Sequence, residues 1–235
     1  MSQTTQAPGI PLEDMYARRL ANKEGIKRKH LQQLAQAVVK PLTRNGFSAR
    51  YVQDREEARK AILELVPEAA TIGVGGSMTI REIGVLDDLY SRGHVIYNHW
   101  RPGLSQEEIL AIRRAHLGCD VFLTSTNALT LKGQIVSTDG AGNRVCAMTF
   151  GPKRVIIVAG ANKIVRDLEA ALARIKDVCT PRVMGESGDP IPCVVTGVCT
   201  DCDSPARACR ATIILDRRPM LTETFVLLVG EELGF

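Results

Sequence analysis

The chain has 235 residues, enough to bury one sizeable hydrophobic core, and its 45% hydrophobic and 24% charged residues are typical of a globular protein. No apolar run approaches the roughly 20 residues that a membrane-spanning helix requires, and the first residues lack the apolar core of a secretory signal. We therefore expect a cytoplasmic protein without a membrane span, in which cysteines stay reduced.

The formal net charge of +4 is unevenly distributed along the chain. Residues 1 to 60 contain 12 Lys and Arg against 6 Asp and Glu, whereas the rest of the chain is close to neutral. The basic run from Lys27 to His30 has no stacking aromatic residues and no nucleic-acid reader motif beside it. It therefore favours a solvated helix face, and no nucleic-acid partner is expected.

The first 45 residues are expected to form a tail and a helical arm. Pro8, Gly9 and Pro11 lie close together in the tail, and a helix is predicted from Leu12 to Lys40 because apolar residues recur at helical spacing in its second half. Pro41 is expected to end it. The remaining residues, 46 to 235, are expected to form a single domain.

From residue 46 onward, short apolar segments alternate with segments of helical pattern. Strands are expected at 47–52, 70–76, 94–98, 119–126, 154–160, 211–216 and 224–230, with helices between most of them. A hairpin is expected at 129–150, with a glycine-rich turn at 139–143. This order predicts an α/β domain of three layers with a mixed, mostly parallel sheet.

The stretch "GVGGSMT" joins a predicted strand to a predicted helix and is the first candidate ligand site. Its candidate binding residues are Gly73, Gly75, Gly76, Ser77 and Thr79. Glycines let the backbone approach a ligand, and such turns lie at the carboxyl ends of strands, where α/β proteins bind ligands. The spacing matches neither a Rossmann fingerprint nor a P-loop, so an ordinary turn with a capping serine stays an alternative.

Two further polar loops are expected at the same edge of the sheet. Their candidate binding residues are Ser125, Asn127, Thr130 and Asn143. Together with the glycine turn, these loops predict a pocket for an anion or a sugar. Glu82, one helical turn beyond the glycines, and Asp139 are the candidates for acid or base catalysis. An exposed helix position for Glu82 and a turn role for Asp139 are the alternatives.

Four of the seven cysteines lie within "CVVTGVCTDCDSPARAC", at positions 193, 199, 202 and 209. The central C-x2-C is a common chelating unit for zinc or an iron–sulfur cluster, so Cys193, Cys199, Cys202 and Cys209 are candidate metal ligands. The outer spacings match no standard zinc finger or ferredoxin pattern. Packing as reduced thiols and disulfide formation stay open, although the expected compartment disfavours disulfides. The other three cysteines are expected in the core.

Four ordered motifs make the chain similar to the LUD (lactate utilisation) domain family, of the LutC/YkgG type. They are "TIGVGGSMTIREIGVLDDL", "TSTNALTLKGQIVSTDGAGNRV", "GPKRVIIVAGANKIV" and "PCVVTGVCTDCDSPARAC". The resemblance implies a fold like that of ribose-5-phosphate isomerase and CoA-transferases, and a pocket at the glycine turn facing Asn127, Thr130, Asp139 and Asn143. One departure is that Ser125 and Thr126 stand where the resemblance implies an acidic form of the motif.

The resemblance also implies a role in oxidising L-lactate to pyruvate beside partner proteins that carry iron–sulfur centres. One hypothesis is an enzyme or enzyme subunit acting on a small anionic organic acid or a sugar phosphate. The alternative is a non-catalytic assembly or electron-transfer subunit that binds a metal or iron–sulfur centre through its cysteines. The sequence leaves open whether the isolated chain is an enzyme.

Overall fold

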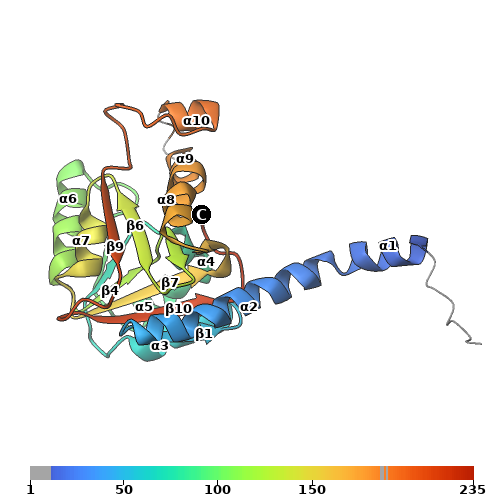
Figure 1. Cartoon of the computed structure of the whole chain (residues 1–235). Helices are drawn as coiled ribbons and strands as arrows, with labels where there is room; N and C mark the ends of the chain where they lie inside the picture. Colours follow the sequence, from blue (N-terminus) through green and yellow to red (C-terminus); the bar gives the residue numbers. More distant parts are fainter. Residues whose placement is uncertain (1–11, 186–187, 189) are drawn as a thin grey trace, which may run out of the picture.

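The computed structural model describes residues 12–185, 188 and 190–235, and its centre is a parallel sheet (Figure 1). Six strands lie in the order β1-β10-β7-β4-β2-β3. Their bounds are β1 (Ser48–Val52), β2 (Ile72–Val74), β3 (Ile96–Asn98), β4 (Val121–Thr124), β7 (Arg154–Gly160) and β10 (Glu223–Val229). Every pairing in this sheet is parallel, which confirms the predicted α/β class with a mostly parallel central sheet.

A second, smaller sheet contains antiparallel strands, but not the pairing that the sequence predicted. Its order is β8-β5-β6-β9, formed by β5 (Ala128–Thr130), β6 (Ile135–Asp139), β8 (Ile164–Val165) and β9 (Ala211–Leu215). β6 pairs antiparallel with β5 and β9, whereas β5 and β8 are parallel. The antiparallel strands therefore form a sheet of their own rather than an extension of the main one.

The predicted hairpin at 129–150 is wrong in its second half, because a helix, α7 (Asn143–Thr149), follows β6. The true hairpin turn contains Gly133, whose φ of +79° suits glycine. The Asp139 carboxylate accepts hydrogen bonds from the backbone N–H groups of Arg144 (2.9 Å) and Val145 (3.1 Å). These bonds satisfy free donors in the first turn of α7, so the glycine-rich segment leads into a helix.

One face of the main sheet is covered by α3 (Arg55–Leu65), α4 (Met78–Ile83) and α5 (Val85–Ser91). Within β7, Ile156 and Val158 pack on this side, while Val155 and Ile157 pack on the other, as the two-residue period of a strand requires. A single helix was expected from 77 to 90. It is interrupted at Gly84, whose φ of +73° ends α4.

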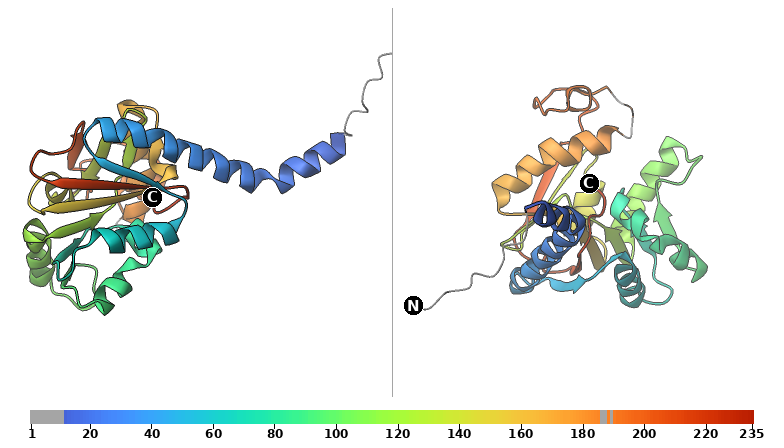
Figure 2. Two further views of the ribbon diagram at one scale, coloured as in Figure 1. Left: turned by 90° about the horizontal axis from the view of Figure 1, so that it is seen from below. Right: turned by 90° about the vertical axis from the view of Figure 1, so that its right-hand side faces the viewer.

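The other face is covered by α2 (Lys23–Arg44), α7 and the second sheet, and α8 (Leu168–Arg174) packs on the far side of that second sheet (Figures 1 and 2). The shorter elements lie around the rim. They are α6 (Gln106–Ala115), α9 (Thr180–Gly185), α10 (Pro192–Thr196), the 3-10 turns η1 (His116–Gly118) and η2 (Ala161–Lys163), and the π-helical turn η3 (Ile175–Cys179).

The helical arm consists of α1 (Leu12–Ala21) and α2, and its first part extends away from the domain (Figure 2). In the second half of α2, Ala35, Val38 and Leu42 are fully buried against the sheet. Pro41 does not end the helix as expected. Proline removes only its own N–H donor from the helix, and the Pro41 carbonyl still accepts from the N–H of Asn45 (3.0 Å). The buried side chain of Leu42 holds the last turn against the sheet.

Among the described helices, none combines the length and the apolar character that crossing a lipid bilayer requires.

Candidate functional site

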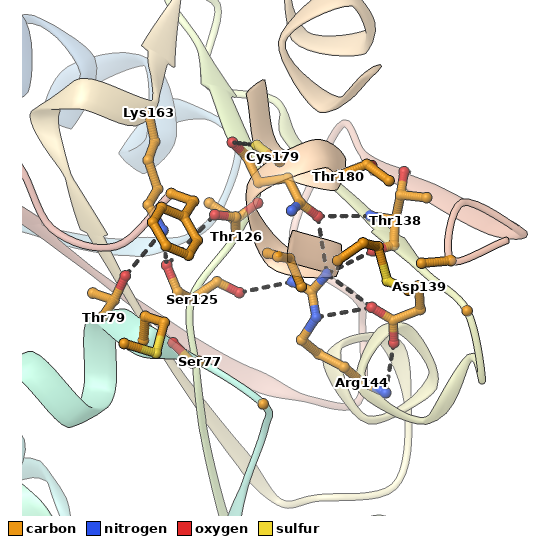
Figure 3. A pocket seen from close by; sticks show the side chains of 18 of the residues that line it. Ser77, Thr79, Ser125, Thr126, Thr138, Asp139, Arg144, Lys163, Cys179 and Thr180 are labelled. Carbon is orange, nitrogen blue, oxygen red and sulfur yellow. Dashed lines mark hydrogen bonds and ion pairs between the residues drawn. The ribbon is translucent and has the colours of Figure 1, made fainter. Parts of the chain in front are cut away.

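A polar pocket of about 180 Å³ lies at the carboxyl ends of the parallel strands (Figure 3). The segment after β2 contributes Gly76 to Thr79, and the segment after β4 contributes Ser125 to Asn127. Lys163 follows β7, and Asp139 stands at the end of β6. Parallel strands all end at one edge of a sheet, so these polar segments meet although they lie far apart in the sequence.

Six of the residues predicted from the sequence line this pocket: Gly76, Ser77, Thr79, Ser125, Asn127 and Asp139. Five others do not line it within the described part of the chain: Gly73, Gly75, Glu82, Thr130 and Asn143. The remaining wall is partly apolar and includes Trp100, Val183 and Phe235. The structure thus brings together about half of the predicted set.

The glycines of the turn serve close packing rather than room for a ligand. A Cβ on Gly73 would lie 2.9 Å from both the Cys119 Sγ and the Phe122 ring. A Cβ on Gly76 would lie 3.0 Å from the ring of Trp100. A Cβ on Gly75 would likewise crowd its neighbours, although less severely. The sequence predicted that this turn lies at the pocket, but it did not predict that the glycines are needed for close packing.

The other three residues outside the wall have local structural contacts. The Thr130 hydroxyl accepts from the N–H of Gln134 (3.1 Å) and so closes the hairpin turn. Asn143 is the first residue of α7. Glu82 is exposed, and its Oε2 atom accepts from the backbone N–H of Gly234 (2.8 Å), which ties the C-terminal segment to α4.

Arg144 connects the loops of the pocket (Figure 3). Its Nε and Nη2 atoms lie 2.9 Å and 2.8 Å from Asp139 Oδ1, and its side chain is 12% exposed. Nη1 donates to the Ser125 carbonyl (3.1 Å) and the Ser137 hydroxyl (3.3 Å), and Nη2 donates to Asn127 Oδ1 (2.9 Å). These contacts engage all five N–H groups of the guanidinium, so its function here is to position neighbouring residues.

Asp139 is the partner of this arginine. Oδ1 accepts from the guanidinium, and Oδ2 accepts from the backbone N–H groups of Arg144 and Val145. Both carboxylate oxygens are thus engaged as hydrogen-bond acceptors. Asp139 therefore positions Arg144 and begins α7, and it is poorly suited to the acid–base role that the sequence suggested.

Lys163, which the sequence patterns did not single out, is the most unusual residue of the pocket. Its side chain is 3% exposed, and Nζ donates to the hydroxyls of Thr79 (2.9 Å) and Ser125 (3.0 Å). No carboxylate forms an ion pair with it within the described residues. Burial, and then repulsion by Arg174 and Arg144, lowers the pKa of Lys163 to about 7.

One signal for Lys163 was present in the sequence. It stands three residues after a strand that was predicted correctly, at the same edge of the sheet as the glycine turn. Two of the three N–H groups of the Lys163 ammonium donate hydrogen bonds, and the third has no partner among the described residues.

The four clustered cysteines line a second, smaller cavity. All seven cysteines are free thiols. Among the described residues, no group of three or more His, Cys, Asp or Glu side chains is arranged to hold a metal ion. Cys119 and Cys179 are buried as predicted, whereas Cys146 is exposed, because it lies on the outer side of α7 opposite Val145 and Ala147.

The fold and the pocket define an α/β protein with a cavity at the strand ends of its parallel sheet. The family model of the LUD domain matches residues 35–229, and the chain belongs to this family. No curated protein matches the sequence.

Two solved structures are similar to the chain. A DUF162 family protein from Deinococcus radiodurans is 14% identical, with 86% of this chain and 97% of that chain covered and a TM-score of 0.48. Ribose 5-phosphate isomerase from Plasmodium falciparum is 19% identical, with 48% and 52% covered and a TM-score of 0.32.

Proposed function

We propose that the polar pocket binds the anion of a small organic acid, and that Lys163 is the residue that attracts its charge. The observation that carries this proposal is an almost fully buried ammonium group without a carboxylate partner among the described residues. A buried charge that lacks a counter-ion destabilises a fold, and such groups are concentrated at functional sites. An anionic ligand would supply both the missing charge and an acceptor for the third N–H.

The charges around the pocket support an anion rather than a cation. Asp139 and Arg144 neutralise each other, so Lys163 leaves the charged side chains of the wall with a net charge of +1 when it is protonated. Asn127 adds a donor, because its Oδ1 accepts from Arg144 and Thr138 while its Nδ2 atom has no partner among the described residues. A carboxylate or phosphate oxygen matches these donors.

We further propose a role in lactate utilisation, as membership of the LUD domain family supports. In this role the pocket binds L-lactate, and the chain acts as a subunit of a system that oxidises it to pyruvate. Oxidation of lactate to pyruvate releases two electrons and two protons. Iron–sulfur partner subunits would accept the two electrons, and the two protons would pass to water, because Lys163 is already protonated when it holds the anion.

A non-catalytic assembly or electron-transfer subunit is the second candidate function. It is favoured by the helical arm, which extends from the domain and exposes large apolar side chains at Tyr16, Leu20 and Ile26. Turnover of lactate by the isolated chain with an artificial electron acceptor would favour an enzyme. A visible chromophore in the purified chain would favour the electron-transfer role.

Calorimetric titration of the full chain with lactate, pyruvate and ribose 5-phosphate tests the pocket. We expect Lys163→Met to weaken binding of the preferred anion about 10- to 100-fold, the range for a lost charge-assisted hydrogen bond. Lys153 precedes β7 at the opposite edge of the sheet, and its exposed side chain pairs with Asp120. Lys153→Met is therefore the matched control, and we expect it to bind like the wild type.

A second variant tests the charge without deleting the lysine. Ser125→Asp would place a carboxylate beside the Lys163 ammonium, since the Ser125 hydroxyl already lies 3.0 Å from it. This internal counter-ion should displace the anion and abolish binding while the fold is retained. Equal affinities of the wild type, Lys163→Met and Ser125→Asp would refute the proposal.

A further inference from the structure

Four cysteines that the polar pocket does not use enclose a small cavity of their own. Cys193, on α10, is buried, and Cys199, Cys202 and Cys209 are half-buried in the segment that follows. All four line one cavity of about 10 Å³. The four cysteines therefore border one common space, about the volume of one water-sized sphere.

The segment that presents these thiols has little else to hold it in place. From Gly197 to Arg210 the chain forms neither helix nor strand, and no side chain in this range is buried. Segments of this length without structure of their own are uncommon in compact domains, because burial does not offset the entropy lost on ordering them. A link between the thiols would supply the missing stabilisation.

Arg207 organises the segment around the cavity. Its Nη1 and Nε atoms donate to the backbone carbonyls of Cys202 (2.8 Å) and Cys209 (3.0 Å), and its Nη2 atom pairs with Asp201 (2.7 Å). Lys176 lines the same cavity. Lys176 therefore adds a positive charge beside the four cysteines, whereas the charge of Arg207 is already paired with Asp201. Thiols that pack only as small apolar groups have no need of this charge.

We propose that Cys193, Cys199, Cys202 and Cys209 form a closed tetrathiolate site for one structural zinc ion. Four thiolates and a divalent ion carry a net charge of −2, which Lys176 partly offsets, while Arg207 is paired with Asp201 and donates to the backbone carbonyls of Cys202 and Cys209. Four protein ligands without an open position are typical of structural rather than catalytic zinc. An iron–sulfur cluster is the other group that four thiolates can hold, and the elemental analysis described below distinguishes the two.

Zinc binding requires the segment to contract. A tetrahedral ion with Zn–S distances of about 2.3 Å brings its sulfur atoms to roughly 3.8 Å from one another. The sulfur atoms do not form such a ligand set in the described structure. Because the segment between the cysteines carries no buried side chain, it can move without disturbing the core. This proposal does not depend on the anion-binding function of the neighbouring pocket.

Elemental analysis of the full chain, purified anaerobically without chelators, tests the site. We expect about one zinc per chain in the wild type and at least a tenfold lower content in Cys199→Ser and Cys202→Ser. The exposed Cys146 lies on α7, outside the cavity, so Cys146→Ser is the matched control and should retain zinc. Cobalt(II) added to metal-free wild type should produce the absorption of a tetrathiolate centre, a readout that needs no variant.

Three results would overturn the proposal. Wild type with less than roughly a tenth of an equivalent of zinc, even after incubation with zinc, would leave four ordinary thiols. Iron with inorganic sulfide and broad visible absorption would identify a cluster instead of a single ion. Equal zinc in the wild type and in both cysteine variants would place the metal elsewhere in the chain.

Discussion

The polar pocket and the cavity lined by the four clustered cysteines share two wall residues, Thr180 and Ala208. The two regions nevertheless differ in what holds them in place. The polar groups of the pocket stand at strand ends, and the buried pair of Arg144 and Asp139 fixes the loops between them. Three of the four clustered cysteines lie between Gly197 and Arg210, where the chain has no strand, helix or buried side chain, and the fourth, Cys193, is on α10. The pocket is therefore a product of the fold, whereas the arrangement of the cysteine segment depends on what its thiols bind.

The largest difference between the two regions should appear when each loses its central arginine. Arg144→Met leaves the buried Asp139 carboxylate without its charged partner, with only backbone N–H groups bound to it, so we expect the free energy of unfolding to fall by about 3–5 kcal/mol. Urea denaturation followed by circular dichroism measures this loss.

The matched variant is Arg207→Met in the cysteine segment. Its partner Asp201 is 67% exposed, and such exposed pairs contribute only about 0–1 kcal/mol. The comparison should be made on metal-free protein. Similar losses in the free energy of unfolding for Arg144→Met and Arg207→Met would contradict this contrast, in which the fold fixes the pocket but does not fix the cysteine segment.

A smaller effect is expected from crowding the strand beneath the pocket. Gly73→Ala places a methyl group 2.9 Å from Cys119 and Phe122, and overpacking of this kind typically destabilises a fold by about 1–3 kcal/mol. Gly118→Ala is the control, because nothing lies within 4 Å of its added Cβ. Thermal unfolding should show a lower Tm for Gly73→Ala alone, and an unchanged Tm would mean that the strand tolerates the extra volume.

The smallest effect is the pH dependence of anion binding. Because Lys163 has a pKa of about 7 in the free pocket, raising the pH from 7 to 8 reduces its protonated fraction and should weaken anion affinity roughly fivefold. Calorimetry at several pH values measures this slope. Affinity should reach its plateau below pH 7, where the lysine is fully charged.

The same lysine predicts a trend in stability. Its pKa is lower in the folded than in the unfolded chain, so the unfolded chain binds more protons between pH 7 and about 10, and the stability contribution of Lys163 rises with pH across this range. Lys163→Met should remove this rise. The cysteine segment serves as the internal comparison, because its thiols should not affect anion binding near pH 7. A flat affinity profile in the wild type would show that the charge of Lys163 does not control binding.

Local patterns in the sequence determined the elements and the edge of the sheet at which the pocket lies. The run "RVIIVAG" predicts β7, and the pairs Asp54/Glu57 and Ser105/Glu108 predict the starts of α3 and α6, where the structure has the expected cap bonds. These signals are read within a few residues of chain. Because the ends of parallel strands meet at one edge, the same patterns also predict that Ser77 and Ser125 lie near each other.

Only the tertiary structure decided which polar groups act in the pocket. Lys163 lies 84 residues from Thr79 and 38 from Ser125, and its position after β7 indicates the edge of the sheet but not that its ammonium is buried without a carboxylate partner. The role of Gly73 likewise depends on Phe122 and Cys119, which approach from the neighbouring strand. Burial and charge pairing depend on segments that are distant in the chain. Local patterns therefore do not reveal which charged side chains are shielded from water and which form ion pairs.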